Sequence, residues 1–331
     1  MKVVAVAFGC VLVLGGAGAG WLYWHLDRNI HSVDIDGALG DDRPARPVAA
    51  ASPSATAAAR PVDTSVLNLL VLGSDSRTGE ENKALGGGDS GGARSDTAMV
   101  VHLDAGRTSA TVVSIPRDTL VERPSCPTES GGTSAVAYGV MFNSAYALGG
   151  PVCAVKTVEH LTGVRMDHYL EVDFAGFAKL VDALGGVDVT TGEAIDDDLS
   201  HLHLEAGDHH LDGAQALAFA RTRHGVGDGS DLGRIKLQQQ LVKALMSKVS
   251  ADGLLTDPAR LYTVADAATG SLTADTGLDS LAELTGLARS LGDLTADSVR
   301  TVVMPVVRAP SDANRVVADE PEAGKLWESL R

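Results

Sequence analysis

The chain alternates between short runs of β-branched apolar residues and longer stretches with apolar positions at helical spacing. Runs of the first kind predict strands over residues 66–73, 97–104, 110–115, 168–173 and 299–305. The helical spacing predicts helices over residues 143–148, 152–161, 174–184, 212–221, 232–249 and 279–291. Strands that alternate with helices in this way predict an α/β domain, with a central mixed β-sheet covered by helices on both faces.

An uncharged stretch runs from Val3 to Trp24 at the amino terminus. As a helix it would span roughly 33 Å, enough for a hydrocarbon core of about 30 Å. It is longer than the apolar region of most secretory signals, and it ends in aromatic residues that are typical of a membrane interface. The pattern favours an uncleaved transmembrane signal-anchor over residues 1–25. A cleaved signal peptide and a buried core helix are the alternatives.

A stretch rich in Pro, Ala and Ser follows, at about residues 41–64. It has few large apolar residues with which to build a core, so we expect a semi-extended stalk. The predicted organisation is an anchor over residues 1–25, an extracellular stalk over 26–64 and an α/β catalytic domain over 65–331.

Composition and net charge exclude some classes of protein. The chain has 331 residues, a net charge of −16 and 44 % apolar residues, which is too apolar for a disordered chain. So acidic a surface repels a phosphate backbone, and we therefore expect no nucleic-acid partner. Cys126 and Cys153 are the only cysteines outside the predicted anchor. They suit one disulfide in an oxidising exterior, with two unpaired buried thiols as the alternative.

Arginine gathers at the predicted ends of strands and helices, and no lysine accompanies it there. The residues are Arg77, Arg94, Arg117, Arg221, Arg223 and Arg234. A guanidinium group makes planar, two-pronged contacts to phosphate oxygens and cannot lose its charge. Clustered arginines would repel one another unless an anion met them, so the pattern favours a phosphate site. The alternative is that each arginine pairs with a nearby aspartate.

Two aspartates lie at the edges of the first two predicted strands. Asp75 follows one strand and Asp96 begins the next. They could supply two carboxylates to a hard cation such as Mg²⁺, which commonly takes one or two carboxylates plus substrate phosphate. Capping of the chain or surface pairing is the alternative for each.

Histidines cluster at residues 201–203 and 208–210. Their alternation with leucine indicates an exposed strand or hairpin rather than a zinc site, because no cysteine or further spaced histidine supports metal binding.

A series of motifs runs in order from about Asn68 to Gln240. They include LVLGSDSR, RSDTAMVV, VVSIPRDT, LDGAQALAFARTRH and DLGRIKLQQQ. In this order they resemble the LytR-CpsA-Psr family. The resemblance implies a single-pass membrane protein of a Gram-positive envelope, with its carboxy-terminal domain extracellular. Such a protein moves a glycopolymer from a polyprenyl pyrophosphate carrier onto peptidoglycan.

The resemblance also implies roles for individual residues. Asp75 and Asp96 would hold Mg²⁺ or Mn²⁺. Residues binding the pyrophosphate would be Arg77, Arg94, Arg117, Arg221, Arg223, Arg234 and Gln238, and the catalytic set would be Arg117, Arg221, Arg223 and Asp75. The proton acceptor is open between Asp75 and Asp118. Residues 158–189 would line an apolar slot for the polyprenyl tail.

Other functions stay open at this point. A hydrolase that cleaves polyprenyl pyrophosphates with water would use the same site, and a non-catalytic carrier-binding protein would need no acceptor. A transcriptional attenuator would need a basic cytoplasmic surface, which the acidity opposes. The glycopolymer itself is not indicated. The excess of Ala, Gly and Arg over Lys suggests a GC-rich genome such as that of an actinobacterium.

Overall fold

The structure is a computed structural model that describes residues 20–46, 65–74, 95–128, 131–223, 226, 231–251 and 257–331. The strands are β1 (His31–Val33), β2 (Leu67–Ser74), β3 (Ser95–Leu103), β4 (Ala110–Ile115), β5 (Leu120–Arg123), β6 (Ala137–Met141), β7 (His168–Asp173), β8 (Val187–Thr191), β9 (Ile195–Asp197), β10 (Leu202–Leu204), β11 (Gly207–Leu211), β12 (Leu272–Asp275), β13 (Val299–Val303), β14 (Val306–Ala309) and β15 (Asp312–Ala318). The helices are α2 (Ile35–Leu39), α4 (Asn143–Thr162), α5 (Phe174–Ala183), α6 (Gly213–Arg221), α7 (Asp231–Ala251), α8 (Pro258–Thr269), α9 (Leu281–Ser290) and α10 (Glu322–Glu328). Residues 20–29 form a further helix, and Ala296–Ser298 a short 3₁₀ turn.

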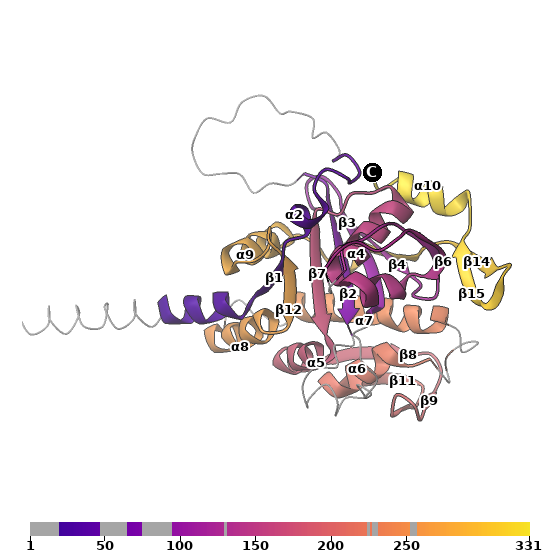
Figure 1. Ribbon diagram of the computed structural model, residues 1–331. Coiled ribbons are helices and arrows are strands. Elements are labelled where there is room, and N and C mark those ends of the chain that lie inside the picture. The colour runs from indigo at the N-terminus through magenta and orange to yellow at the C-terminus, as the bar shows by residue number, and fades with distance from the viewer. Residues whose placement is uncertain are drawn as a thin grey trace, which may run out of the picture.

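A seven-stranded mixed sheet forms the centre of the molecule, in the order β1-β12-β7-β2-β3-β4-β13 (Figure 1). β2 runs parallel to β7 and antiparallel to β3, while β4 runs parallel to β13. The prediction of a central mixed sheet is confirmed.

Alternating side chains of the central strands are buried on opposite faces of the sheet. On one face, Leu70, Leu72 and Val100 pack with Val155 and Val158 of α4. On the other face, residues such as Leu69 and Leu103 pack with side chains of α7 and α9. Helices therefore cover both faces of the sheet. Strands that place apolar side chains on both faces need this cover, because either face would otherwise be exposed to water.

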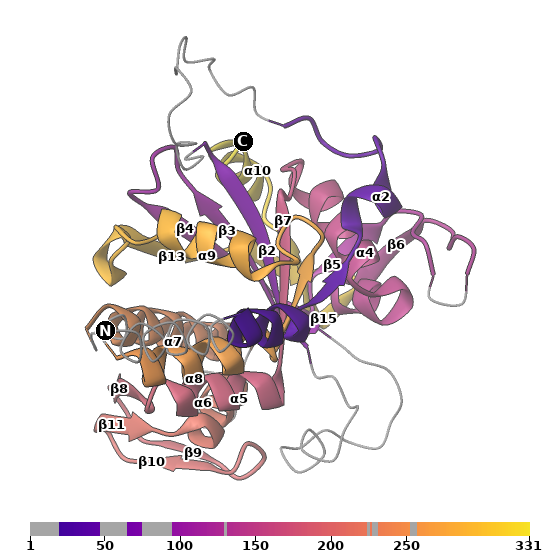
Figure 2. The same ribbon diagram turned by 90° about the vertical axis from the view of Figure 1, so that its left-hand side faces the viewer.

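A second core lies beyond the sheet, among α5, α6, α7 and two antiparallel strand pairs (Figure 2). One pair is β8 with β11, and the other is the β9–β10 hairpin that lies between these strands in the chain. Gly213, the first residue of α6, allows a close approach to α5, because a Cβ atom there would lie 2.1 Å from the carbonyl oxygen of Ala178. The predicted hairpin character of the histidine-rich segments is confirmed.

Residues 30–46 belong to the folded domain, so the prediction of a stalk is wrong for this part of it. β1 pairs in parallel with β12 at the edge of the central sheet. Ile35 and Leu39 of α2 are buried in the main core. The side chain of Arg43 is buried and donates from Nη2 to Oε1 of Glu159 at 2.6 Å. Residues 47–64 lie outside the described residues.

α4 carries a break in its middle, where two separate helices were predicted. Gly149 and Gly150 have non-helical backbone angles there. Gly149 is required by a close contact, because a Cβ atom would lie 2.3 Å from the carbonyl oxygen of Pro127. The second half of α4 also holds Cys153, which forms the predicted disulfide with Cys126.

Most of the predicted anchor, residues 1–19, lies outside the described residues. Among the residues that are described, no helix combines the length and the apolarity needed to cross a bilayer.

Candidate functional site

A cavity of about 420 Å³ lies between the central sheet and the layer formed by α5, α6 and α7. Its wall is mostly apolar and includes Met99, Phe174, Phe177, Leu217 and Leu245. Guanidinium groups gather on the rest of the wall. Arg117, Arg221, Arg223 and Arg234 all line the cavity, although they come from three separate parts of the chain. Four of the six arginines singled out in the sequence therefore line one cavity.

A single carboxylate joins three of these arginines. Oδ1 of Asp231 lies 2.6 Å from Nη2 of Arg234, 3.3 Å from Nη2 of Arg223 and 3.9 Å from Nε of Arg117. The Asp231 side chain is only 13 % exposed, and that of Arg234 only 4 %. Oδ2 of Asp231 is buried and has no hydrogen-bond partner among the described residues. The Asp231 carboxylate thus brings three guanidinium groups together beside the cavity.

Asp231 was not predicted as a site residue, although the sequence around it carries a signal. Asp231 begins the DLGR motif and stands three residues before Arg234, the spacing at which charged side chains meet on a helix.

The loop that carries Arg223 is held by the β9–β10 hairpin. Oδ2 of the buried Asp197 accepts a hydrogen bond from the backbone N–H of Arg223 at 3.0 Å. Beside it, the hydroxyl groups of Thr222 and Ser200 lie 2.8 Å apart. Asp197 was missed because nothing local in the sequence distinguishes it from the acidic residues on either side.

Arg221 stands at the last position of α6, where an aromatic ring supports it. Its guanidinium carbon lies 4.9 Å from the centroid of the Phe174 ring, within the range of a cation–π contact. α6 itself begins with a capping box between Asp212 and Gln215. Phe174 also lines the apolar wall, so one side chain contacts both the arginine and the cavity.

Gln238 lies on α7 and lines the same cavity. Its Nε2 donates to Oγ1 of Thr97 at 3.0 Å and to the carbonyl oxygen of Ala220 at 2.9 Å. In this structure, Gln238 connects α7 both to β3 and to the end of α6.

The remaining predicted residues lie outside what is described. Asp75, Arg77 and Arg94 are not among the described residues, and for Asp96 only its backbone position in β3 is described. Ser74 pairs with Ser95, and the register shifts beside this pair.

Asp118, one of the two candidate proton acceptors, is engaged elsewhere. Its Oδ1 accepts from Nη1 of Arg315 at 3.2 Å, and it does not appear among the lining residues of the cavity. The slot for the polyprenyl tail stays a prediction, and residues 158–189 supply only part of the apolar wall of this cavity. Val172, Phe174, Phe177 and Leu180 come from residues 158–189, but α6 and α7 supply much of the remaining apolar wall.

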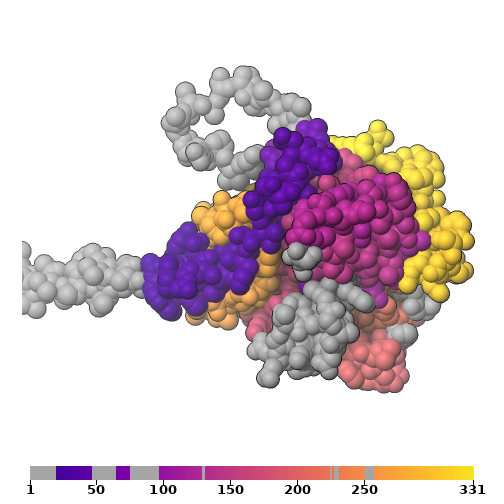
Figure 3. Space-filling model, viewed as in Figure 1, coloured from indigo at the N-terminus to yellow at the C-terminus, as the bar shows by residue number. Residues whose placement is uncertain are grey.

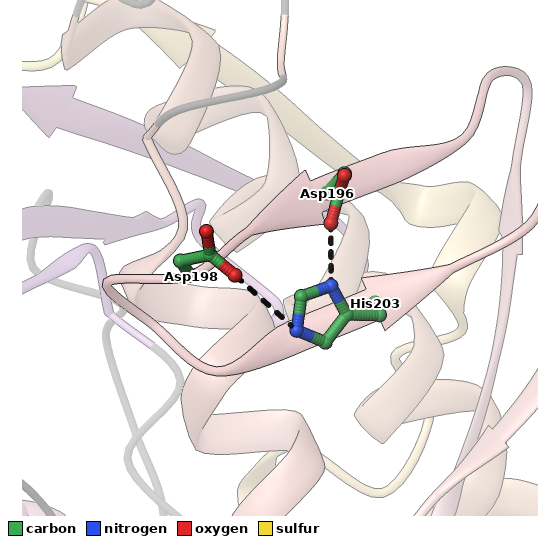
Figure 4. Close-up of side chains that lie close together, drawn as sticks. All are labelled: Asp196, Asp198 and His203. Atoms are coloured by element: carbon green, nitrogen blue, oxygen red, sulfur yellow. Dashed lines mark hydrogen bonds and ion pairs between the residues drawn. The ribbon is translucent and has the colours of Figure 1, made fainter.

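The tip of the β9–β10 hairpin carries an exposed cluster of two aspartates and a histidine (Figure 4). The His203 ring lies between Asp196 at Nδ1 and Asp198 at Nε2 (Figure 4). All three side chains are more than half exposed, in contrast to Asp197 between them, which faces inward. Alternation along the strand therefore separates the exposed cluster from the residue that holds the arginine loop.

The model of the family described as the LytR_cpsA_psr family matches residues 22–331. The chain belongs to this family. The resemblance seen in the motifs is thereby confirmed, and the arginine-lined cavity is a feature of a LytR_cpsA_psr domain.

Two curated relatives and one solved structure are similar to the chain. Probable cell wall biosynthesis protein LcpB of Corynebacterium glutamicum is 36 % identical over 284 residues, which is 84 % of this chain and 64 % of the relative. Polyisoprenyl-teichoic acid–peptidoglycan teichoic acid transferase TagU of Bacillus cereus is 38 % identical over 190 residues, 57 % of this chain and 55 % of the relative. The crystal structure of B. subtilis TagV superimposes with a TM-score of 0.61 and 26 % identity, covering 81 % of this chain and 96 % of the other.

The chain thus spans between about half and two thirds of the length of these curated relatives.

Proposed function

We propose that this protein is a phosphotransferase that moves a glycopolymer from a polyprenyl pyrophosphate carrier onto peptidoglycan outside the cell. The observation that carries the proposal is the single cavity that combines an apolar wall with four arginines. A polyprenyl pyrophosphate has the same two parts, an apolar tail and a doubly charged head. The name of the TagU relative, a transferase that joins teichoic acid to peptidoglycan, supports the same chemistry.

The arginines have a direct role in this chemistry. A hydroxyl group of the acceptor attacks the phosphorus that bears the glycan, a new P–O bond forms, and the bridging P–O bond to the second phosphorus breaks. Polyprenyl phosphate leaves, and the hydroxyl proton passes to a carboxylate, for which Asp75 is our candidate. Arg117, Arg221 and Arg223 would hold the phosphate oxygens and offset the charge that develops on them.

We propose Mg²⁺ or Mn²⁺ as the cofactor, held by Asp75 and Asp96. The register between β2 and β3 supports this, because Ser74 and Ser95 pair and each immediately precedes one of the two aspartates. Carboxylate oxygens are the ligands that these cations prefer, and the metal would further neutralise the diphosphate.

We also propose that residues 1–25 anchor the protein in the cell membrane, with the carboxy-terminal domain outside. The uncharged run from Val3 to Trp24 and the disulfide between Cys126 and Cys153 support this location.

The test incubates the full chain in detergent with a labelled, lipid-linked glycan, with and without peptidoglycan oligomers. Transfer of label to peptidoglycan supports the proposal, whereas equal release of free glycan in both reactions would identify a hydrolase. Binding without any turnover would identify a carrier-binding protein.

A double substitution, Arg221→Ala with Arg223→Ala, tests the site itself. We expect transfer to fall by at least about 10³-fold, the scale seen when an arginine is removed from a phosphoryl-transfer site. The matched control replaces Arg300 and Arg308, which are exposed on β13 and β14, and should retain activity. Full transfer by the site variant would exclude these arginines from the reaction.

A further inference from the structure

The helix of residues 20–29 is fixed to the globular domain at several points. Nε2 of His25 and Nδ2 of Asn29 each lie 3.1 Å from Oδ1 of Asp266 on α8. On the other side, Oδ1 of Asp27 accepts a hydrogen bond of 2.9 Å from the backbone N–H of Leu281, at the start of α9. The helix consequently lies between α8 and α9, as both ribbon views show (Figures 1 and 2).

One side chain of this helix is buried while its large apolar neighbours are not. Leu26 is only 8 % exposed. By contrast, Trp21, Leu22, Tyr23 and Trp24 are between 38 % and 56 % exposed. These four successive side chains are spread around one turn of the helix, and we call them the aromatic patch. So many exposed large apolar side chains at one place mark a binding surface.

The chemistry of the patch fits the boundary between lipid and water. The Arg28 guanidinium stands 4.3 Å from the centroid of the Trp24 ring, and the Trp21 ring stacks on His25 at 5.3 Å. Indole and phenol rings beside a cationic group are typical of the headgroup layer of a bilayer. The patch also lies at the end of the uncharged run that begins at Val3.

The two helices that hold this segment are themselves poorly covered. Among the described residues of α9 none is buried, and on α8 only Thr269 is. Leu261 of α8 is 38 % exposed. The space-filling view shows the indigo residues of helix 20–29 at the outer surface of the domain on this side (Figure 3).

We infer that the bilayer interface is the partner of this surface, and that helix 20–29 holds the domain in one orientation on the membrane. The aromatic patch lies in the headgroup layer, the α8–α9 side faces the membrane, and the β14–β15 hairpin at the opposite end faces away (Figure 1). The inference rests on the membrane anchorage given under the proposed function. It adds that the domain is held directly by the helix and not on a flexible tether.

The test uses the full chain with Cys10→Ser, reconstituted in phosphatidylcholine vesicles that contain an acceptor dye on a lipid headgroup. A donor dye is attached through Leu261→Cys on α8 or, in a second sample, through Val307→Cys on β14, which is 44 % exposed. We expect greater energy transfer from position 261 than from position 307. Equal transfer from both positions, or greater transfer from 307, would overturn the inference.

A substitution tests the contact that fixes the helix. Asp266→Ala removes the carboxylate shared by His25 and Asn29, and the difference in transfer between the two labelled positions should shrink or be lost. Asp293→Ala, at an exposed site after α9, is the matched control and should preserve the difference. An unchanged difference in the Asp266 variant, confirmed as folded by circular dichroism, would contradict the role of this contact.

Flotation of the same vesicles distinguishes a failure of the membrane anchorage from a failure of the inferred orientation. A chain that does not float with the vesicles refutes the membrane anchorage and the orientation together. A chain that floats but gives equal transfer refutes the orientation alone.

Discussion

Asp231→Asn removes a negative charge that contacts Arg117, Arg223 and Arg234, while it keeps the size of the side chain. At an effective dielectric constant of about 20, a pair of charges about 3–4 Å apart attracts by roughly 4–6 kcal/mol before desolvation is counted. Removing one partner of a buried ion pair typically costs about 3–5 kcal/mol in net stability. Arg117 and Arg223 are 21 % and 29 % exposed, so solvent screening lowers the cost of removing their partner. We expect Asp231→Asn to lower the free energy of unfolding by about 2–3 kcal/mol.

Urea unfolding at neutral pH measures this loss as a lower midpoint at unchanged slope. Asp196→Asn is the matched control, because that side chain is 83 % exposed, and it should change stability by less than about 0.5 kcal/mol. If Asp231→Asn lowers the free energy of unfolding by no more than Asp196→Asn does, the Asp231 carboxylate does not hold the arginine cluster together.

Binding of pyrophosphate provides a second test of the Asp231→Asn variant. In the native protein the Asp231 carboxylate competes with a bound anion for the guanidinium groups, whereas the neutral Asn side chain of the variant does not. Inorganic pyrophosphate should therefore raise the unfolding midpoint more in the variant than in the native protein. An equal rise in both would show that the anion binds away from Asp231.

Further predictions concern the scaffold. Cys153→Ala should lower stability by about 3–4 kcal/mol in the chain-entropy model, since the disulfide closes a loop with a sequence separation of 27, and thermal unfolding with and without reductant checks this. Gly213→Ala should cost about 1–3 kcal/mol through the clash with α5, whereas Gly286→Ala in the open part of α9 should be neutral or slightly stabilising when both are compared by urea unfolding. Burial acts to raise the pKa of Asp275, but hydrogen bonds from a histidine and two backbone N–H groups outweigh it and hold that pKa below 3.8. The charged form is therefore favoured by folding, so stability should fall as pH drops from about 4 through the lowered pKa, and Asp275→Asn should flatten this part of the stability–pH curve.

Local pattern was enough to predict much of the central sheet. β4 and β7 begin and end at the predicted residues. β4 buries Val112, Val113 and Ile115 within the sheet, and β7 buries Tyr169. The start of α5 was also predicted, and Asp173 caps it by accepting from the backbone N–H of Gly176 at 2.6 Å. Such elements can be predicted from a few consecutive residues.

Other elements depend on partners far along the chain. β1 has three residues and β12 has four, which is too short for an apolar pattern to show in the sequence. They are strands because they pair with each other, roughly 240 positions apart in the chain. At the site, the excess of arginine over lysine led to Arg117, Arg221, Arg223 and Arg234, which line one cavity. Their binding of pyrophosphate stays a prediction. Asp197 acts through a tertiary contact to a backbone N–H group, which sequence spacing does not reveal.

The pairing of β1 with β12 has a practical consequence for protein production. A truncated fragment that starts at residue 65 would lack the outermost strand and expose the edge of β12 along Thr273–Asp275, where β1 pairs. An uncovered sheet edge invites pairing between molecules, so such a fragment should self-associate. A fragment that begins at residue 30 keeps the edge covered and is the better choice for crystallisation.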